Sequence, residues 1–149
     1  MNEGVLYHPG AYSRVACIRL EDVARKFVHD DPDSVEMYSR DLIKCEDSTF
    51  LPGSLKPAFD EIRQHSLYDV LPDNIYTFVT YESNAQTYGR HKDAESVLLI
   101  QAVGKMMYRF DDGSFIILKP GDALYIPSGV YHDPETVMGP RVTVSCKVK

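Results

Sequence analysis

"SVLLIQAVGKMMYRFDDGSFIILKPGDALYIPSG", residues 96–129, is a succession of short apolar runs separated by turn residues. Gly, Asp or Pro recurs between the runs at intervals of roughly 8–12 residues, which is typical of all-β sandwiches and barrels. Asp111-Asp112-Gly113 predicts a hairpin turn, because glycine accepts a positive φ without steric cost. The stretch therefore predicts strands that close into a barrel or jelly roll, an arrangement that leaves few exposed sheet edges.

The strand pattern continues on both sides of this stretch, so we expect the barrel core to span 74–149. Residues 1–70 are more mixed and predict one or two helices that pack on the barrel. Ser54 is placed to cap a helix that runs to about residue 66, with Leu55, Phe59 and Ile62 as its apolar face. The other expected elements are a strand at 15–20, a helix at 21–28 and a strand at 38–45. We expect one mostly-β domain over 1–149.

Composition excludes several classes of protein. The net charge is -6 and the pI is about 5.3, so the chain lacks the basic excess of a nucleic-acid-binding protein. No run approaches the ~20 apolar residues of a membrane span. The first residues, MNEGVLYHPG, do not form a basic segment followed by an apolar one, so we expect no signal peptide. The three cysteines show no C-x-x-C spacing and predict reduced thiols in a cytoplasmic protein.

His91 and Asp93 are the first candidates for chemistry. In a strand, residues two apart point to the same side, so the pair could face into the barrel. His132 ends the turn–strand–turn segment 119–132 and could supply a third ligand. Two histidines and one carboxylate form the facial triad of non-haem iron(II) oxygenases. His29 and Asp31 have the same spacing but lie in a polar, proline-containing stretch, so we expect them to bind nothing.

The sequence around these residues resembles the Jumonji-C-type, cupin-fold iron(II)/2-oxoglutarate oxygenases. The resemblance rests on His91-Lys92-Asp93, on "QAVG" at 101–104, on "LKPGDALYIPSGVYH" at 118–132 and on "RVTVS" at 141–145, and it covers about residues 75–149. It implies a double-stranded β-helix (cupin) fold. It also implies that His91, Asp93 and His132 bind Fe(II) or another divalent metal, with 2-oxoglutarate as co-substrate.

Met106 departs from the family pattern. Related hydroxylases carry a lysine or arginine there to hold the distal carboxylate of 2-oxoglutarate. Arg141 is the replacement that we expect, because its planar guanidinium binds a carboxylate bidentately. Tyr88, Tyr108 and Ser145 could add hydroxyl donors. This requires the polar residues of 141–145 to face the pocket, and the alternation alone also allows the reverse.

Three functions follow as hypotheses. The first is an iron(II)/2-oxoglutarate oxygenase that hydroxylates a C–H bond of a small molecule or peptide. The second is a metal-dependent cupin of other chemistry, such as a dioxygenase, isomerase or lyase. The third is a non-catalytic cupin that binds a small ligand or another chain. The sequence leaves open the substrate, the metal, and whether barrel edges pair into a homodimer.

Overall fold

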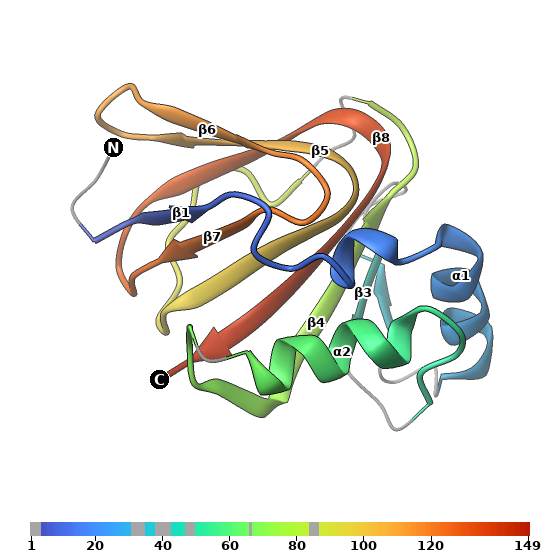
Figure 1. Ribbon diagram of the computed structural model, residues 1–149. Helices are drawn as coiled ribbons and strands as arrows, with labels where there is room; N and C mark the ends of the chain where they lie inside the picture. Colours follow the sequence, from blue (N-terminus) through green and yellow to red (C-terminus); the bar gives the residue numbers. More distant parts are fainter. Residues whose placement is uncertain (1–3, 31–34, 38–42, 47–49, 66, 84–86) are drawn as a thin grey trace.

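The computed structural model describes every residue except 1–3, 31–34, 38–42, 47–49, 66 and 84–86 (Figure 1). Strands dominate the described residues, and the prediction of a mostly-β fold with helices from the N-terminal half is confirmed. The elements in chain order are β1 (Leu6–His8), a 3₁₀ helix (Val15–Cys17), α1 (Leu20–His29), β2 (Val35–Met37), β3 (Ile43–Glu46), α2 (Leu55–Gln64), β4 (Val70–Thr80), β5 (Val97–Phe110), β6 (Phe115–Leu118), β7 (Ala123–Ile126) and β8 (His132–Val148).

The strands form one curled antiparallel sheet in the order β1-β7-β5-β8-β4-β3-β2, and β6 pairs with β5. The predicted hairpin joins β5 to β6, with Gly113 at φ +85°. β5 and β8 are paired over most of their length. Figure 1 shows both helices lying against one outer side of the curled sheet.

Two apolar clusters occupy the two faces of the sheet. The outer cluster joins alternate residues of β5 and β8 to the buried side of α2, and includes Leu98, Ile100, Val142, Val144, Phe59 and Ile62. The inner cluster contains the intervening β5 residues and includes Val97, Leu99, Met106 and Tyr108. A strand whose two faces are both buried reads as a nearly continuous apolar run, which explains "SVLLIQAV".

The alternation of β5 side chains between the two faces of the sheet is interrupted partway along the strand. Leu99 and Tyr108 are nine residues apart, so a regular strand would place them on opposite faces, yet both belong to the inner cluster. Register shifts relative to β8 lie between Gln101 and Met106. Gly104 within them has φ +71°, and a Cβ there would collide with the carbonyl oxygens of Met138 and Pro140 on β8. The bulge resets the alternation and turns Tyr108 inward.

The structure corrects three expectations about elements. The strand expected at 15–20 is instead the 3₁₀ helix followed by the start of α1. The apolar runs "SVLLIQAV" and "KMMYRF", which Gly104 separates in the sequence, form one strand, and the strand that contains "RVTVS" begins at His132 rather than Arg141. These errors arise because pairing with distant strands, not local composition, sets strand length.

Ser54 is not a side-chain cap of α2. Its hydroxyl donates to Asp22 Oδ2 at 2.6 Å and accepts the Arg19 N–H at 2.9 Å. The hydroxyl therefore ties α2 to the beginning of α1. Of the strand expected at 38–45, residues 38–42 lie outside the described residues, and the rest belongs to β3.

Candidate metal centre and adjoining cavity

His91 and His132 lie opposite each other on two paired segments. An isolated antiparallel bridge joins them: each N–H donates to the other's carbonyl oxygen, at 2.9 and 2.8 Å. Their rings lie 4.4 Å apart between centroids. Backbone pairing across the barrel therefore brings together two residues that are far apart in the sequence.

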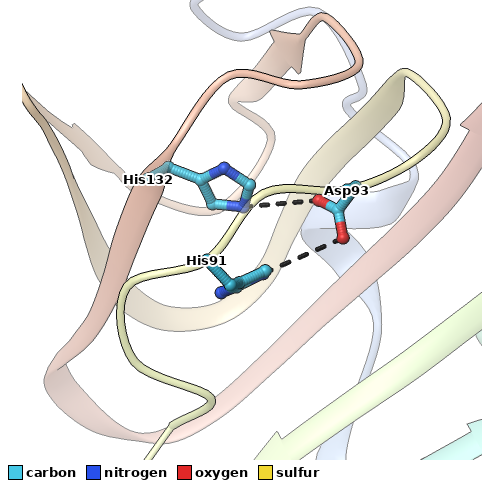
Figure 2. Close-up of side chains that lie close together, drawn as sticks. All are labelled: His91, Asp93 and His132. Carbon is cyan, nitrogen blue, oxygen red and sulfur yellow. Dashed lines mark ion pairs between the residues drawn. The ribbon is translucent and has the colours of Figure 1, made fainter.

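Asp93 completes the cluster, and Figure 2 shows its carboxylate beside the two imidazoles, facing both. Its oxygens lie 3.9 Å from His91 Nε2 and 3.4 Å from His132 Nε2. One donor atom from each residue lies within 4.8 Å of the others. The backbone carbonyl of Asp93 accepts the Gly129 N–H at 2.9 Å, which ties the loop that carries Asp93 to the turn before β8. Two imidazoles and one carboxylate suit a divalent transition metal.

Hydrogen bonds orient both rings as metal ligands require. His91 Nδ1 lies 2.7 Å from the Gly89 carbonyl oxygen, and His132 Nδ1 lies 3.0 Å from that of Val130. A proton on each Nδ1 leaves each Nε2 as the acceptor that faces Asp93. Burial is the main reason why the pKa of His132 lies below its ordinary value, so this imidazole stays neutral and free to coordinate.

A cavity of about 120 Å³ adjoins the cluster, and its lining includes every side chain that the sequence singled out for the site. The residues expected to hold co-substrate lie on β5, on β8 and in the segment before His91: Tyr108, Arg141, Ser145 and Tyr88. The polar residues of 141–145 face this cavity, while Val142 and Val144 pack in the outer cluster. Of the two orientations that the sequence allowed for 141–145, the structure therefore has the one in which the polar residues face the pocket.

Arg141 is the lysine or arginine among the described residues that line the cavity. It is 4% exposed, and its Nε is buried with no hydrogen-bond partner. Burial lowers its pKa from the ordinary value, while Tyr108 and Tyr88 act in the opposite direction. A buried guanidinium is costly unless an anion or other acceptors satisfy it. The residue therefore fits the carboxylate of a ligand inside the cavity.

Thr143 and Gln101 form a polar contact that sequence reasoning did not identify. Thr143 donates to Gln101 Oε1 at 2.8 Å, and Gln101 Nε2 donates to the Val103 carbonyl oxygen at 2.8 Å. The Thr143 hydroxyl thus gives its proton to Gln101, and it also hydrogen-bonds with the side chain of Tyr108. Phe78, Thr87, Leu99 and Pro134 also line the cavity. Only alternation along 74–80 could have indicated Phe78, and no local signal pointed to Pro134.

Two other residues from the sequence argument lie apart from the cavity lining. Met106 is fully buried in the inner cluster. His29 ends α1 and stacks on Phe50 at 3.7 Å between ring centroids, and Asp31 lies outside the described residues. Within the described residues, no helix is both long and apolar enough to cross a membrane.

Comparisons with known proteins found similar solved structures but no similar sequence family. No protein-family model matches the chain, and no curated protein does. Among solved structures, Escherichia coli YcfD superposes with a TM-score of 0.66 at 16% identity, covering 99% of this chain and 50% of YcfD. YcfD, described as a ribosomal oxygenase, in complex with cobalt and succinic acid gives 0.66 at 15% identity, covering 97% and 48%. KdgF from Halomonas sp. gives 0.54 at 11% identity, covering 82% and 89%.

These likenesses concern the fold, and the chain spans about half the length of YcfD. A cupin superfamily protein from Desulfitobacterium hafniense also superposes, with a TM-score of 0.50 at 13% identity, covering 76% of this chain and 84% of that one. The chain therefore has the cupin fold that YcfD and smaller cupins share, and it carries a cluster of two histidines and one aspartate that could hold a metal ion.

Proposed function

We propose that this chain is a cupin-fold oxygenase that binds a divalent metal, iron(II) in the active form, and uses 2-oxoglutarate to hydroxylate a small molecule or peptide. His91, Asp93 and His132 hold the metal in this proposal. The observation that carries it is Arg141, a buried cation with an unpartnered N–H that lines the same small cavity as the three ligands.

A dicarboxylate matches the two ends of this cavity. One carboxylate and the adjacent keto oxygen suit the metal, and the far carboxylate suits Arg141. Tyr108 stands beside the guanidinium with a hydroxyl group that can donate to the same anion, whereas the Thr143 hydroxyl gives its proton to Gln101. The YcfD structure with cobalt and succinic acid supports the proposal, because it pairs this fold with a divalent metal and a dicarboxylate.

The protein's own residues have three tasks in this scheme. The backbone-anchored imidazoles and Asp93 fix the metal position. Arg141 orients the co-substrate by its far end and stays charged by pairing with it. Leu99 and Phe78, on the cavity wall, exclude water from the space between. The chemistry that iron(II) supplies is activation of dioxygen, coupled to oxidative decarboxylation of 2-oxoglutarate to succinate.

A second candidate is a metal-dependent cupin in which the substrate itself, an organic acid, occupies the cavity. Met106 at the usual basic position favours this alternative, because the anchor of the related hydroxylases is absent from β5. Both candidates use the same metal ligands and the same arginine. They differ in whether 2-oxoglutarate is consumed.

The test is metal analysis combined with 2-oxoglutarate turnover. Protein loaded anaerobically with Fe(II) should bind one equivalent of metal, and it should release succinate from 2-oxoglutarate in air but not without oxygen. Asp93→Ala should lose both metal and succinate release. Saturable metal binding without 2-oxoglutarate binding at millimolar concentration would reject the oxygenase and leave the second candidate.

A further inference from the structure

A second hollow, the outer groove, opens from the metal centre toward solvent. It has a volume of about 380 Å³ and shares five lining residues with the inner cavity: Phe78, Tyr88, His91, Asp93 and Ser145. Beyond them it extends over Tyr76 and Lys147. Its size lies at the lower end of the ~300–1,000 Å³ that small-molecule sites occupy. His91 and Asp93 therefore line both the inner cavity, which Arg141 also lines, and the outer groove.

Strand geometry places one cation in each hollow. Arg141 and Lys147 are six residues apart on β8, so their side chains share a face. Tyr76 pairs with Ser145 across β4 and β8, and Val97 pairs with Lys147 across β5 and β8. The outer groove thus has an aromatic residue and an aliphatic residue beside Lys147.

Lys147 is held in the groove by weak contacts. Its side chain is 32% exposed, and its Nζ lies 5.9 Å from the centroid of the Tyr76 ring. Its ion-pair partner, Glu95, is 3.7 Å away and 51% exposed. A solvent-exposed pair of this kind contributes little to stability. A ligand carboxylate can therefore replace Glu95 at low cost.

Given the proposed function, charge balance indicates that a ligand of the outer groove is negatively charged. A divalent metal and Arg141 are balanced by Asp93 and a doubly charged 2-oxoglutarate. Among the described residues that line the groove, Lys147 is then the charge without a counterpart inside it. A cationic substrate would meet this ammonium group at close range.

We infer that the outer groove binds the primary substrate and that this substrate is a small organic carboxylate with an apolar or aromatic body. Its carboxylate pairs with Lys147, and its body packs against Tyr76 and Val97. The inference rests on the proposed function, which supplies the metal and the filled inner cavity. It identifies Lys147 as the residue that determines substrate charge.

Three probes of the same shape test the inference: 3-phenylpropanoate, 3-phenylpropanamide and 3-phenylpropylamine. Each is titrated by ligand-observed NMR into protein loaded with Zn(II) and saturated with 2-oxoglutarate, which keeps the probes away from Arg141. The carboxylate should bind the wild type at least fivefold more tightly than the amide or the amine. Lys147→Gln should remove that preference without changing the affinity for the amide.

Two further variants serve as controls. Glu95→Gln releases Lys147 and should raise the affinity for the carboxylate. Lys149 forms a similar pair with Asp69 at 3.6 Å, but both side chains are largely exposed and neither lines the groove. Lys149→Gln should therefore leave all three affinities unchanged.

The inference is overturned if the amine binds best, if Lys147→Gln keeps the preference for the carboxylate, or if no probe shows saturable binding. The proposed function is judged separately, by 2-oxoglutarate binding, which Lys147→Gln should not affect because Lys147 lies outside the inner cavity. If the wild type does not bind 2-oxoglutarate, the titrations are repeated with metal-free Arg141→Met, in which Lys147 is the remaining lysine or arginine among the described residues that line the two hollows.

Discussion

Arg141 is the residue on which 2-oxoglutarate binding depends in our proposal. Arg141→Met removes the charge but keeps an apolar side chain of similar length. It should weaken 2-oxoglutarate binding by roughly 2–4 kcal/mol, or about 30- to 1,000-fold, the scale for a lost charge-assisted contact in a buried site. Calorimetric titration of metal-loaded protein measures this loss.

Arg141→Met should change the stability of the fold much less than it changes 2-oxoglutarate binding. Because Arg141→Met also removes a buried N–H without a partner, the free energy of unfolding of ligand-free protein should fall by no more than about 1 kcal/mol. Arg109→Met, which removes an exposed pair with Glu135, is the matched control and should leave 2-oxoglutarate affinity intact. Equal binding by wild type and Arg141→Met would show that the anchor is another residue.

His132 makes the stability of metal-free protein depend on pH. Its folded-state pKa lies below the unfolded value of 6.5, mainly because of burial, so the unfolded chain binds more protons as the pH falls through that value. Stability is therefore retained above the unfolded pKa and is lost as the pH drops below it. Urea unfolding of the metal-free protein between pH 8 and pH 5 should show this fall.

His132→Gln should reduce the slope in that range. It should not remove it, because burial also lowers the pKa of His8. The same slope in the variant as in the wild type would mean that His132 is not the buried titrating group.

At the scale of elements, the bulge in β5 connects the barrel to the site. Gly104 has a positive φ and faces two carbonyl oxygens of β8, so Gly104→Ala adds both backbone strain and a collision. We expect a loss of about 3 kcal/mol or more in the free energy of unfolding, since the left-handed conformation alone costs about 1–2 kcal/mol.

Gly113→Ala provides the matched comparison. Gly113 also has a positive φ, +85°, but an added Cβ there meets no atom within 4 Å. Its loss should be limited to the conformational cost of about 1–2 kcal/mol. Equal destabilisation of the two variants by chemical denaturation would contradict the packing explanation for Gly104.

For the whole molecule, a bound metal should join two separate parts of the barrel. His91 and Asp93 lie before β5, whereas His132 begins β8, so coordination links segments that separate on unfolding. Metal at about 100 times its dissociation constant should stabilise the fold by about 2.7 kcal/mol. Thermal unfolding with added Zn(II) and then with a chelator measures the effect.

Two variants show where that metal binds. Asp93→Ala should abolish the metal-dependent rise in melting temperature. His29→Ala combined with Asp31→Ala, which alters the other His-x-Asp pair, should leave both the rise and the metal content unchanged. Loss of bound metal in the double variant would show that the ion is held by the other pair.

The sequence by itself determined the features that local pattern encodes. Repeated apolar runs with turn residues predicted an antiparallel barrel, and Asp111-Asp112-Gly113 predicted a hairpin that the structure contains. The spacing of His91 and Asp93 and the turn before His132 pointed to the cluster, but the strand expected at the pair is wrong: His91 forms an isolated bridge and Asp93 lies in a loop before β5. Side chains in a strand alternate between its two faces, so the sequence of 141–145 left two possibilities for Arg141. Its side chain would point either into the pocket or to the opposite face.

Only the tertiary structure decided what depends on partners distant in the sequence. The bulge at Gly104 places Leu99 and Tyr108 on one face, against the alternation of a regular strand. The bridge between His91 and His132, and the cavity that brings Arg141 near them, arise from pairing between separate segments. Register, burial and the lack of a partner for a side chain are properties of the assembled sheet, so no local pattern in one strand encodes them.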